Sequence, residues 1–299
     1  MSKYPPLIEP KVTAALMQEL GLSTKKRFGQ NFLIDSRVLS RIIAGAGITK
    51  DDTVLEIGPG IGTMTQALSE AAGSVIAVEI DHDLIPVLSK TLAGYDNVTV
   101  INQDILLVDL FTLDGNFLPQ NGRKYKVVAN LPYYITTPIL MKLLESRAPI
   151  ESITVMVQKE VAERMEADPG GKDYGALSLS VQYYCDTKII ANVPQNCFIP
   201  RPNVDSAVIR LLCYDTPPVE AEDPEYMFRL IRQAFSQRRK TLVNTLKSAP
   251  EMNLTREKVE EALAQMGLSA DIRGERLSLS QFAKLSGLLK QEDKACTVY

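Results

Sequence analysis

Histidine, tryptophan and paired cysteines are scarce or missing in this 299-residue sequence. His82 is the only histidine, there is no tryptophan, and the four cysteines (Cys185, Cys197, Cys213 and Cys296) are far apart with no CxxC pair. A zinc site needs clustered histidine and cysteine ligands, whereas His82 lies in an acidic turn, IDHD, typical of a solvated surface residue. The sequence therefore predicts no metal site and disfavours catalysis by a Ser-His-Asp or Cys-His pair.

Long hydrophobic runs are also missing. The N-terminus, MSKYPPLIEPKV, has no apolar stretch of signal-peptide length, and no later segment approaches the roughly 18 apolar residues of a membrane span. Few, scattered cysteines are typical of a reducing compartment. We therefore expect a cytoplasmic protein that does not engage a membrane.

The overall composition is that of an ordinary globular protein, but its charge is unevenly distributed. Hydrophobic residues make up 45% and charged residues 23%, and 299 residues suggest one large and one smaller domain. The net charge is only −3, yet residues 1–50 carry eight basic and three acidic residues, and residues 51–120 carry eleven acidic residues against Lys90 alone. Residues 226–247 carry six basic residues and no acid. The acidic total therefore does not exclude a nucleic-acid partner.

The middle of the sequence alternates short apolar runs with amphipathic stretches, the pattern of a parallel sheet covered by helices. The expected strands are Thr53–Ile57, Ser74–Ile80, Val98–Ile101, Tyr125–Ala129 and Ile153–Gln158, and the expected helices between them are Met64–Ala72, Asp83–Leu92 and Thr137–Glu145. Two later stretches, Ser178–Tyr184 and Ser206–Tyr214, alternate like strands that pair antiparallel at a sheet edge.

A change in composition near residue 215 predicts a domain boundary. Asp215–Glu225 (DTPPVEAEDPE) is rich in proline and acid and has no periodicity, as in a linker. Beyond it the expected helices are Tyr226–Phe235, Arg239–Lys247, Arg256–Met266 and Ser280–Gly287. We therefore expect an α/β domain over residues 1–215, with a basic N-terminal segment at 1–50, and an all-α domain over residues 216–299.

Glycines and carboxylates at expected strand ends indicate a nucleoside pocket. Glu56–Gly62 (EIGPGIG) covers the end of the first strand and the turn after it, and the GxGxG spacing of this turn lets the backbone approach a ligand closely. Glu79 ends the next strand, where a carboxylate can accept hydrogen bonds from ribose hydroxyls, and Asp104 follows the third, where it can accept from an adenine amine. No GKS or GKT sequence is present, so a nucleoside triphosphatase is disfavoured.

A fourth strand end carries Asn130–Tyr133 (NLPY). An exocyclic aromatic amine is a poor nucleophile because its lone pair is delocalised into the ring. The Asn130 side-chain oxygen and the Pro132 carbonyl could hold the amine hydrogens and favour a pyramidal nitrogen. Leu131 would supply fixed shape, and the ring of Tyr133 a surface on which a base can stack.

These motifs and four others span residues 28 to about 280. The others are Phe28–Leu33 (FGQNFL), Phe198–Ser206 (FIPRPNVDS), Phe235–Leu242 (FSQRRKTL) and Arg276–Leu279 (RLSL). Together and in this order, they resemble the bacterial KsgA-type enzymes of the ribosomal RNA adenine dimethylase family. The resemblance implies a Rossmann-like class I methyltransferase sheet with a small all-α C-terminal domain, using S-adenosylmethionine and no metal.

The resemblance also implies roles for single residues. The donor-binding residues would be Asn31, Leu33, Gly58, Glu79, Asp104 and Asn130. Asn130 would lie between the donor and the target base, and Phe198 would form an aromatic wall opposite Tyr133. The family dimethylates two adjacent adenosines near the 3′ end of 16S RNA, so the implied partner of this chain, as a monomer, is 16S rRNA in an immature 30S subunit.

Two basic clusters are candidates for RNA contact. One is Lys25, Lys26 and Arg27; the other is Arg238, Arg239 and Lys240. The second has no acidic residue within residues 226–247, which favours contact with phosphates over an ordinary solvated face.

Three other functions stay open at this point. A macrolide-resistance methylase acting on large-subunit RNA shares the donor motifs and the Asn-x-Pro-aromatic element, although Phe198–Ser206 and Phe235–Leu242 resemble the small-subunit enzymes more closely. The chain could instead act mainly as a checkpoint binding factor in ribosome assembly. A nicotinamide-dependent oxidoreductase is disfavoured by the GxGxG spacing.

Overall fold

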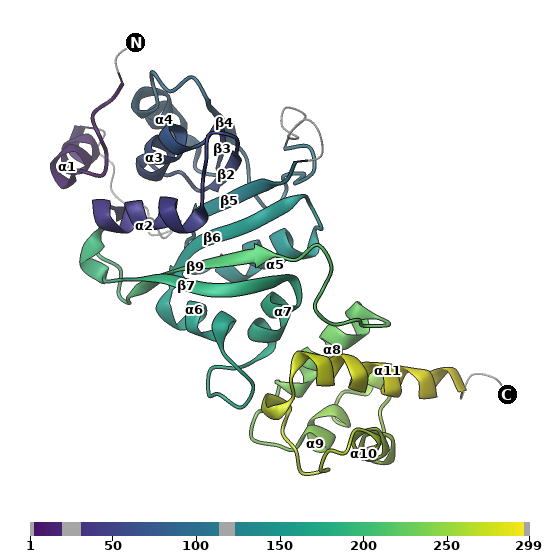
Figure 1. The fold of residues 1–299 in the computed structure, drawn as a ribbon. Helices are drawn as coiled ribbons and strands as arrows, with labels where there is room; N and C mark the ends of the chain where they lie inside the picture. Colours follow the sequence, from purple (N-terminus) through teal and green to yellow (C-terminus); the bar gives the residue numbers. More distant parts are fainter. Residues whose placement is uncertain (1–2, 20–30, 114–122, 296–299) are drawn as a thin grey trace. The chain divides into compact units, whose positions relative to one another are not determined.

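A computed structural model describes residues 3–19, 31–113 and 123–295 of the chain (Figure 1). The chain divides into two compact units. The first, here called the sheet unit, comprises Met1–Ala162 and Thr187–Cys213, and the second, the helical unit, comprises Glu163–Asp186 and Tyr214–Tyr299. Among the described helices, none combines the length and the apolar character needed to cross a membrane.

A seven-stranded sheet in the order β4-β3-β2-β5-β6-β9-β7 forms the framework of the sheet unit. Its strands are β2 (Thr53–Ile57), β3 (Ser74–Glu79), β4 (Val98–Asn102), β5 (Tyr125–Asn130), β6 (Ile150–Gln158), β7 (Cys185–Val193) and β9 (Ser206–Cys213). Strands β2 to β6 run parallel, and β9 is antiparallel to β6. This is the Rossmann strand order with an antiparallel strand inserted before the last one, so the predicted α/β class is confirmed.

Helices cover the sheet, with α2 in front of the strands and α5 behind them in Figure 1. The helices associated with the sheet are α1 (Pro10–Glu19), α2 (Ser36–Ala46), α3 (Thr63–Ala71), α4 (Ile85–Thr91), α5 (Thr136–Glu145) and α6 (Lys159–Glu166). Helix α2 begins where the Asp35 carboxylate accepts from the backbone N–H groups of Arg37 and Val38, and it ends at Gly47 in the left-handed conformation. A short antiparallel pair, β1 (Phe32–Leu33) with β8 (Phe198–Ile199), joins two distant segments.

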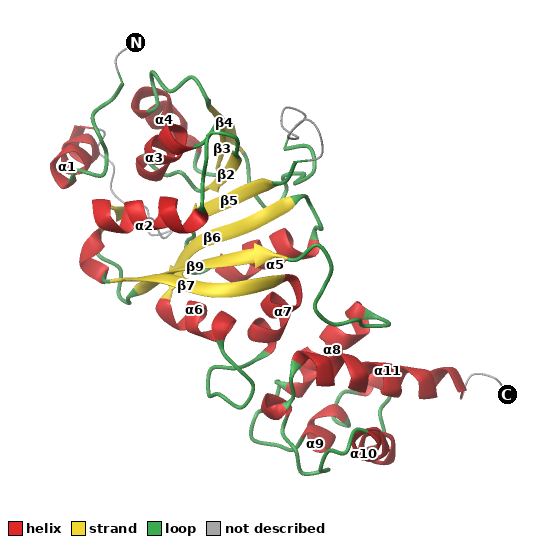
Figure 2. Cartoon of the chain, viewed as in Figure 1, coloured by secondary structure: helices red, strands yellow, loops and turns green. Residues whose placement is uncertain are grey.

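The helical unit has a core of its own. Its helices are α7 (Ala176–Tyr184), α8 (Pro224–Ala234), α9 (Leu242–Leu246), α10 (Arg256–Gln265) and α11 (Leu279–Ala295), drawn in red with the other helices in Figure 2. Leu230, Ile231, Phe282 and Leu285 are fully buried at its centre. The Asp223 side chain caps α8 and also pairs with Lys290.

The prediction of a strand at Ser178–Tyr184 is wrong, because this segment is helix α7. Leu179, Val181 and Tyr183 alternate as in a strand, yet all three are buried on the helix. The helix begins where the Ser178 hydroxyl accepts from the Gly175 N–H and donates to the Arg164 carbonyl. The antiparallel neighbour expected for the Ser206–Tyr214 strand is instead β6 on one side, with β7 on the other.

The last helices differ from the expectation only at their ends. Helix α9 begins at Leu242 rather than at residue 239, because the Thr241 side chain accepts from the Asn244 N–H and fixes the helix start there. The helical unit also takes Glu163–Asp186 from the middle of the chain. The expected division into an α/β domain over residues 1–215 and an all-α domain over residues 216–299 stays a prediction.

Candidate active site

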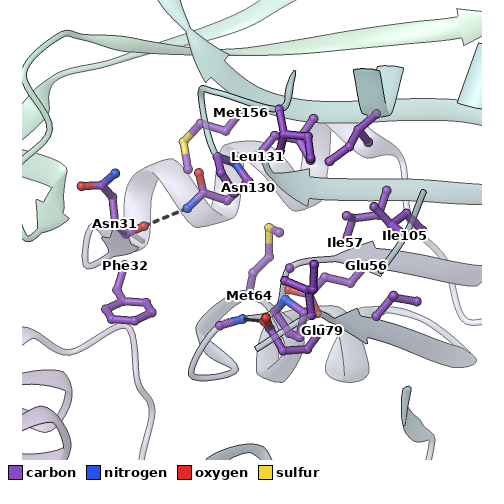
Figure 3. A pocket seen from close by; sticks show the side chains of 18 of the residues that line it. Asn31, Phe32, Glu56, Ile57, Met64, Glu79, Ile105, Asn130, Leu131 and Met156 are labelled. Carbon is purple, nitrogen blue, oxygen red and sulfur yellow. Dashed lines mark hydrogen bonds between the residues drawn. The ribbon is translucent and has the colours of Figure 1, made fainter. Parts of the chain in front are cut away.

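A pocket lies at the carboxyl ends of β2, β3, β4 and β5, where the strand order reverses. It encloses about 1090 Å³, including the part open to solvent. Figure 3 shows it from close by. Of the predicted donor-binding and catalytic residues, nine line the pocket: Asn31, Leu33, Gly58, Glu79, Asp104, Asn130, Leu131, Pro132 and Tyr133. Glu56 of the glycine motif lines it as well.

The glycine turn after β2 forms the floor of the pocket. Gly58 and Gly60 both have positive φ angles, 69° and 60°, which favour glycine. A Cβ on Gly60 would lie 3.0 Å from the Phe32 ring, whereas a Cβ on Gly58 would meet no atom within 4 Å. The turn therefore presents bare backbone to the pocket at Gly58 and packs tightly against Phe32 at Gly60.

The Glu79 carboxylate ties the glycine turn to the end of β3. One oxygen accepts from the Gly60 N–H at 3.0 Å, and the other accepts from the Asp81 N–H at 2.8 Å. The side chain is 4% exposed, and its burial raises the pKa of the carboxyl above the usual value despite these two bonds. The Ile80 N–H also lowers this pKa as a third backbone donor, so one of the four lone-pair positions of the carboxylate is left to accept a ligand hydroxyl.

Within the part of the chain that the structure describes, Glu56 places a buried carboxyl group without hydrogen-bond partners at the pocket. It is fully buried, lines the pocket, and neither of its oxygens has a hydrogen-bond partner among the described residues. Burial raises its pKa to about 8; the nearby Thr65 hydroxyl opposes the rise and the Glu79 carboxylate adds to it. Burying such a carboxyl group costs free energy unless a ligand supplies a hydrogen-bond donor or a positive charge.

The loop after β4 holds Asp104 at the pocket. The Leu106 N–H donates to one Asp104 oxygen at 2.9 Å, which leaves the other oxygen available. The ammonium group of Lys142, on α5, donates to the carbonyls of Leu106 and Val108 at 2.7 and 2.8 Å. Lys142 therefore fastens the loop that carries Asp104 to the helix that follows the NLPY motif, a role that the sequence analysis missed.

Asn130, at the end of β5, has a fixed side-chain orientation. Its amide nitrogen donates to the Asn31 carbonyl at 2.9 Å, the dashed line between the two residues in Figure 3. With the nitrogen engaged in this way, the amide oxygen is available as an acceptor in the pocket. The contact joins residues 99 positions apart, so local sequence patterns could not reveal it.

The rest of the NLPY motif forms a tight turn into α5. Leu131 is buried, and its N–H donates to the Met156 carbonyl at 3.1 Å. The Pro132 carbonyl accepts from the Ile135 N–H at 3.2 Å and from the Thr136 hydroxyl at 3.1 Å, so both of its lone pairs are used within the protein. Of the two predicted acceptors for the amine hydrogens, only the Asn130 side-chain oxygen is therefore left to accept a hydrogen bond from a ligand.

Phe198 does not belong to the pocket wall as described. It pairs with Leu33 in the β1–β8 ladder and is 3% exposed within an apolar cluster that includes Leu33 and Val38. Burial of this ring supports the strand that carries Leu33 to the pocket. Its expected position as an aromatic wall opposite Tyr133 stays a prediction.

The two basic clusters have different outcomes. Lys25, Lys26 and Arg27 lie outside the described residues. In the helical unit, the Arg238 guanidinium donates to the carbonyls of Lys172 and Tyr174 at 2.8 and 3.1 Å and pairs with Glu275 at 3.4 Å. Arg238, although exposed, is therefore held by hydrogen bonds within the helical unit. Arg239 and Lys240 are exposed as well.

The comparison with protein families identifies the chain. The model of the family "Ribosomal RNA adenine dimethylase" matches residues 21–290. The chain belongs to the ribosomal RNA adenine dimethylase family. It is therefore an S-adenosylmethionine-dependent methyltransferase whose substrate is ribosomal RNA, and the oxidoreductase alternative is no longer favoured.

Relatives and solved structures of this family resemble the chain over most of its length. The ribosomal RNA small subunit methyltransferase A of Lachnoclostridium phytofermentans is 57% identical over 96% of this chain and 98% of its own. The protein of the same name from Clostridioides difficile is 48% identical over 93% and 94%. A dimethyladenosine transferase from Plasmodium falciparum has a TM-score of 0.70 at 28% identity over 88% of this chain and 98% of its own. The 23S rRNA methyltransferase ErmE has a TM-score of 0.67 at 28% identity over 87% and 100%.

The pocket fits the methyl donor of this family. S-adenosylmethionine carries an adenosine, an amino acid group and a positively charged sulfonium. Glu79 and Asp104 offer acceptors for ribose and adenine, the bare backbone at Gly58 offers space, and the unpaired carboxyl of Glu56 offers a partner for positive charge. No group of three or more metal-ligating side chains occurs among the residues that the structure describes.

Proposed function

We propose that this chain transfers methyl groups from S-adenosylmethionine to N6 of two adjacent adenosines in a stem-loop near the 3′ end of 16S rRNA. The products would be N6,N6-dimethyladenosines. The fixed side chain of Asn130, with its amide oxygen free at the pocket, is the observation that carries the chemistry of the proposal. The small-subunit target is favoured because the relatives at 57% and 48% identity are named for the small subunit, whereas ErmE is 28% identical.

The roles of the chain's own residues follow from the geometry. The bound donor supplies an electrophilic methyl group. Asn130 accepts an N6 hydrogen of the target adenosine and so orients the nitrogen, while its own amide stays held by Asn31. Tyr133 offers its ring to the base, and Leu131 fills the space beside it. The Glu79 carboxylate favours a cationic ligand, and the positive charge of such a ligand would favour ionisation of the buried Glu56 carboxyl beside it. The proton that N6 releases passes to water, so no general base from the protein is needed near the nitrogen.

A methylation assay with alternative substrates tests the proposal. Purified protein is incubated with labelled donor and either immature 30S particles or protein-free 23S RNA. We expect label in the 16S RNA of the particles, recovered as N6,N6-dimethyladenosine at two adjacent positions. Label confined to 23S RNA would support the macrolide-resistance alternative instead. Binding to the particles without any label would support an assembly-checkpoint factor.

We also propose that the enzyme acts as a monomer in the cytoplasm on an immature 30S particle. Arg239 and Lys240 are its candidate phosphate contacts, because both are exposed and no acid occurs within residues 226–247. Arg238 would contribute mainly by holding the loop at Lys172 and Tyr174 in place.

Removing the charges of Arg239 and Lys240 should weaken RNA binding selectively. In Arg239→Ala/Lys240→Ala, we expect the slope of log affinity for the particle against log salt to fall by about two, with donor affinity unchanged. The control is Arg256→Ala/Lys284→Ala, which removes the same charge from exposed positions of α10 and α11. Equal slopes for the two double variants, measured by binding titration from low to moderate salt, would contradict a specific contact.

A further inference from the structure

We infer that Ser206 is a positioning residue that fixes the ring of Tyr133 for stacking of the target base. The hydroxyl groups of Tyr133 and Ser206 lie 2.7 Å apart and form a hydrogen bond. Ser206 ends the FIPRPNVDS motif, does not line the pocket and has no part in the proposed chemistry so far. The inference rests on the proposed stacking role of Tyr133, and the experiment below separates the two.

The position of Ser206 is rigid. It is the first residue of β9, is fully buried, and pairs with Gln158 in the antiparallel ladder with β6. Next to it, the Asp205 carbonyl accepts from the Lys159 N–H at 3.0 Å, and the Asp205 side chain accepts from the Gln195 N–H at 3.2 Å. The hydroxyl that meets Tyr133 therefore belongs to the sheet framework and not to a loose loop.

Tyr133, by contrast, lies in the turn between β5 and α5. The backbone of that turn is held by the two hydrogen bonds to the Pro132 carbonyl, but the ring can still rotate about its side-chain bonds. The ring is half-buried and lines the pocket, so one face must stay accessible to a base. A bond from its hydroxyl to the sheet fixes the tilt of that face, and stacking depends on tilt and offset.

The chemistry of the pair suits this role. Burial raises the pKa of the Tyr133 phenol, so it stays protonated at neutral pH and can donate to Ser206. Because Ser206 is fully buried, removal of either hydroxyl leaves the other without its partner in a dry site. Tyr133→Phe and Ser206→Ala should therefore have the same effect on the orientation of the ring.

The test combines a double-mutant cycle with a fluorescent base. The variants are Tyr133→Phe, Ser206→Ala, the double variant and Tyr133→Ala. Turnover is measured with immature 30S particles, and stacking is measured with an RNA carrying 2-aminopurine at the target position, whose emission is quenched when the base stacks. The chain contains no tryptophan that would add to the protein's own fluorescence.

The control is Tyr125→Phe, on β5 but outside the pocket lining. It removes the phenol hydroxyl of a fully buried tyrosine, which donates to the Leu110 carbonyl at 2.9 Å. We expect this variant to lose stability without loss of turnover or of 2-aminopurine quenching. A purely structural role for the Tyr133–Ser206 bond would make its variants behave in the same way.

We expect each single variant of the pair to lose roughly tenfold in kcat and most of the quenching, with donor affinity unchanged. The double variant should be no worse than either single one. Normal turnover and quenching in Tyr133→Phe would overturn the inference, even if Ser206→Ala failed to fold. Losses that multiply in the double variant would overturn it as well.

Tyr133→Ala tests the stacking role of the ring separately from its positioning by Ser206. If this variant loses turnover and quenching while Tyr133→Phe keeps both, the ring stacks on the base but needs no support from Ser206. If Tyr133→Ala keeps both, the ring does not receive the base, and the proposed role of Tyr133 fails together with the inference.

Discussion

Replacing Asn130 with alanine is expected to lower methyl transfer roughly 10²- to 10³-fold while donor affinity stays within a few fold. The Asn130 nitrogen is held by the Asn31 carbonyl at 2.9 Å, so the side-chain oxygen is already aimed when the base arrives. Alanine at position 130 has no side-chain acceptor, and the Pro132 carbonyl already accepts two hydrogen bonds within the protein. Single-turnover methylation of immature 30S particles and donor binding by calorimetry measure the two effects separately.

Asn97→Ala is the matched control for this experiment. The Asn97 nitrogen also donates to a backbone carbonyl at 2.9 Å, that of Ser69, but just before β4 begins and outside the pocket lining. We expect near-normal turnover from the control. Near-normal turnover from Asn130→Ala itself would show that the amine is oriented by other groups.

Replacing Glu56 with glutamine is expected to stabilise the donor-free protein at alkaline pH while weakening donor binding. The folded-state pKa of Glu56 is raised to about 8 from an ordinary value of 4.5, chiefly by burial. Between these two values the folded protein holds a proton that the unfolded chain releases. The free energy of unfolding of the wild type should therefore fall as pH rises from about 5 to 8, by roughly 2–4 kcal/mol from this group.

The glutamine variant cannot ionise at this position, so its unfolding free energy should lack this decrease. Urea denaturation at pH 5 and pH 8 measures the difference between the two proteins. Glu261→Gln, at an exposed position on α10, controls for the loss of one negative charge. A decrease of the same size in Glu56→Gln and in the wild type would mean that Glu56 is already ionised in the folded protein. If Glu56→Gln has a higher free energy of unfolding but a lower donor affinity than the wild type, the buried carboxyl lowers stability and is retained for donor binding.

Local patterns in the sequence predicted the parts of the site that lie at strand ends. The strand Thr53–Ile57 forms as expected, and its glycine turn, Glu79, Asp104 and Asn130 meet in one pocket because parallel strands end at the same edge of a sheet. Apolar periodicity and glycine spacing are local properties, and they suffice to place these residues.

The interactions that orient the site could not be predicted in this way. The bonds from Asn130 to Asn31 and from Tyr133 to Ser206 span 99 and 73 residues, and they depend on how β1 and β9 pack rather than on any local pattern. The helix at Ser178–Tyr184 was missed because its alternation of apolar residues is the same as that of a strand. Arg238 has a partly structural role because distant carbonyls satisfy its guanidinium, although its basic neighbours suggested RNA contact alone.

Mass spectrometry of 16S rRNA from cells with and without this protein tests the central proposal most directly. We expect two adjacent N6,N6-dimethyladenosines near the 3′ end when the protein is present. We expect two unmodified adenosines when the gene is deleted or carries Asn130→Ala. An unchanged 16S RNA in the deletion strain, with dimethyladenosine lost from 23S RNA instead, would contradict it.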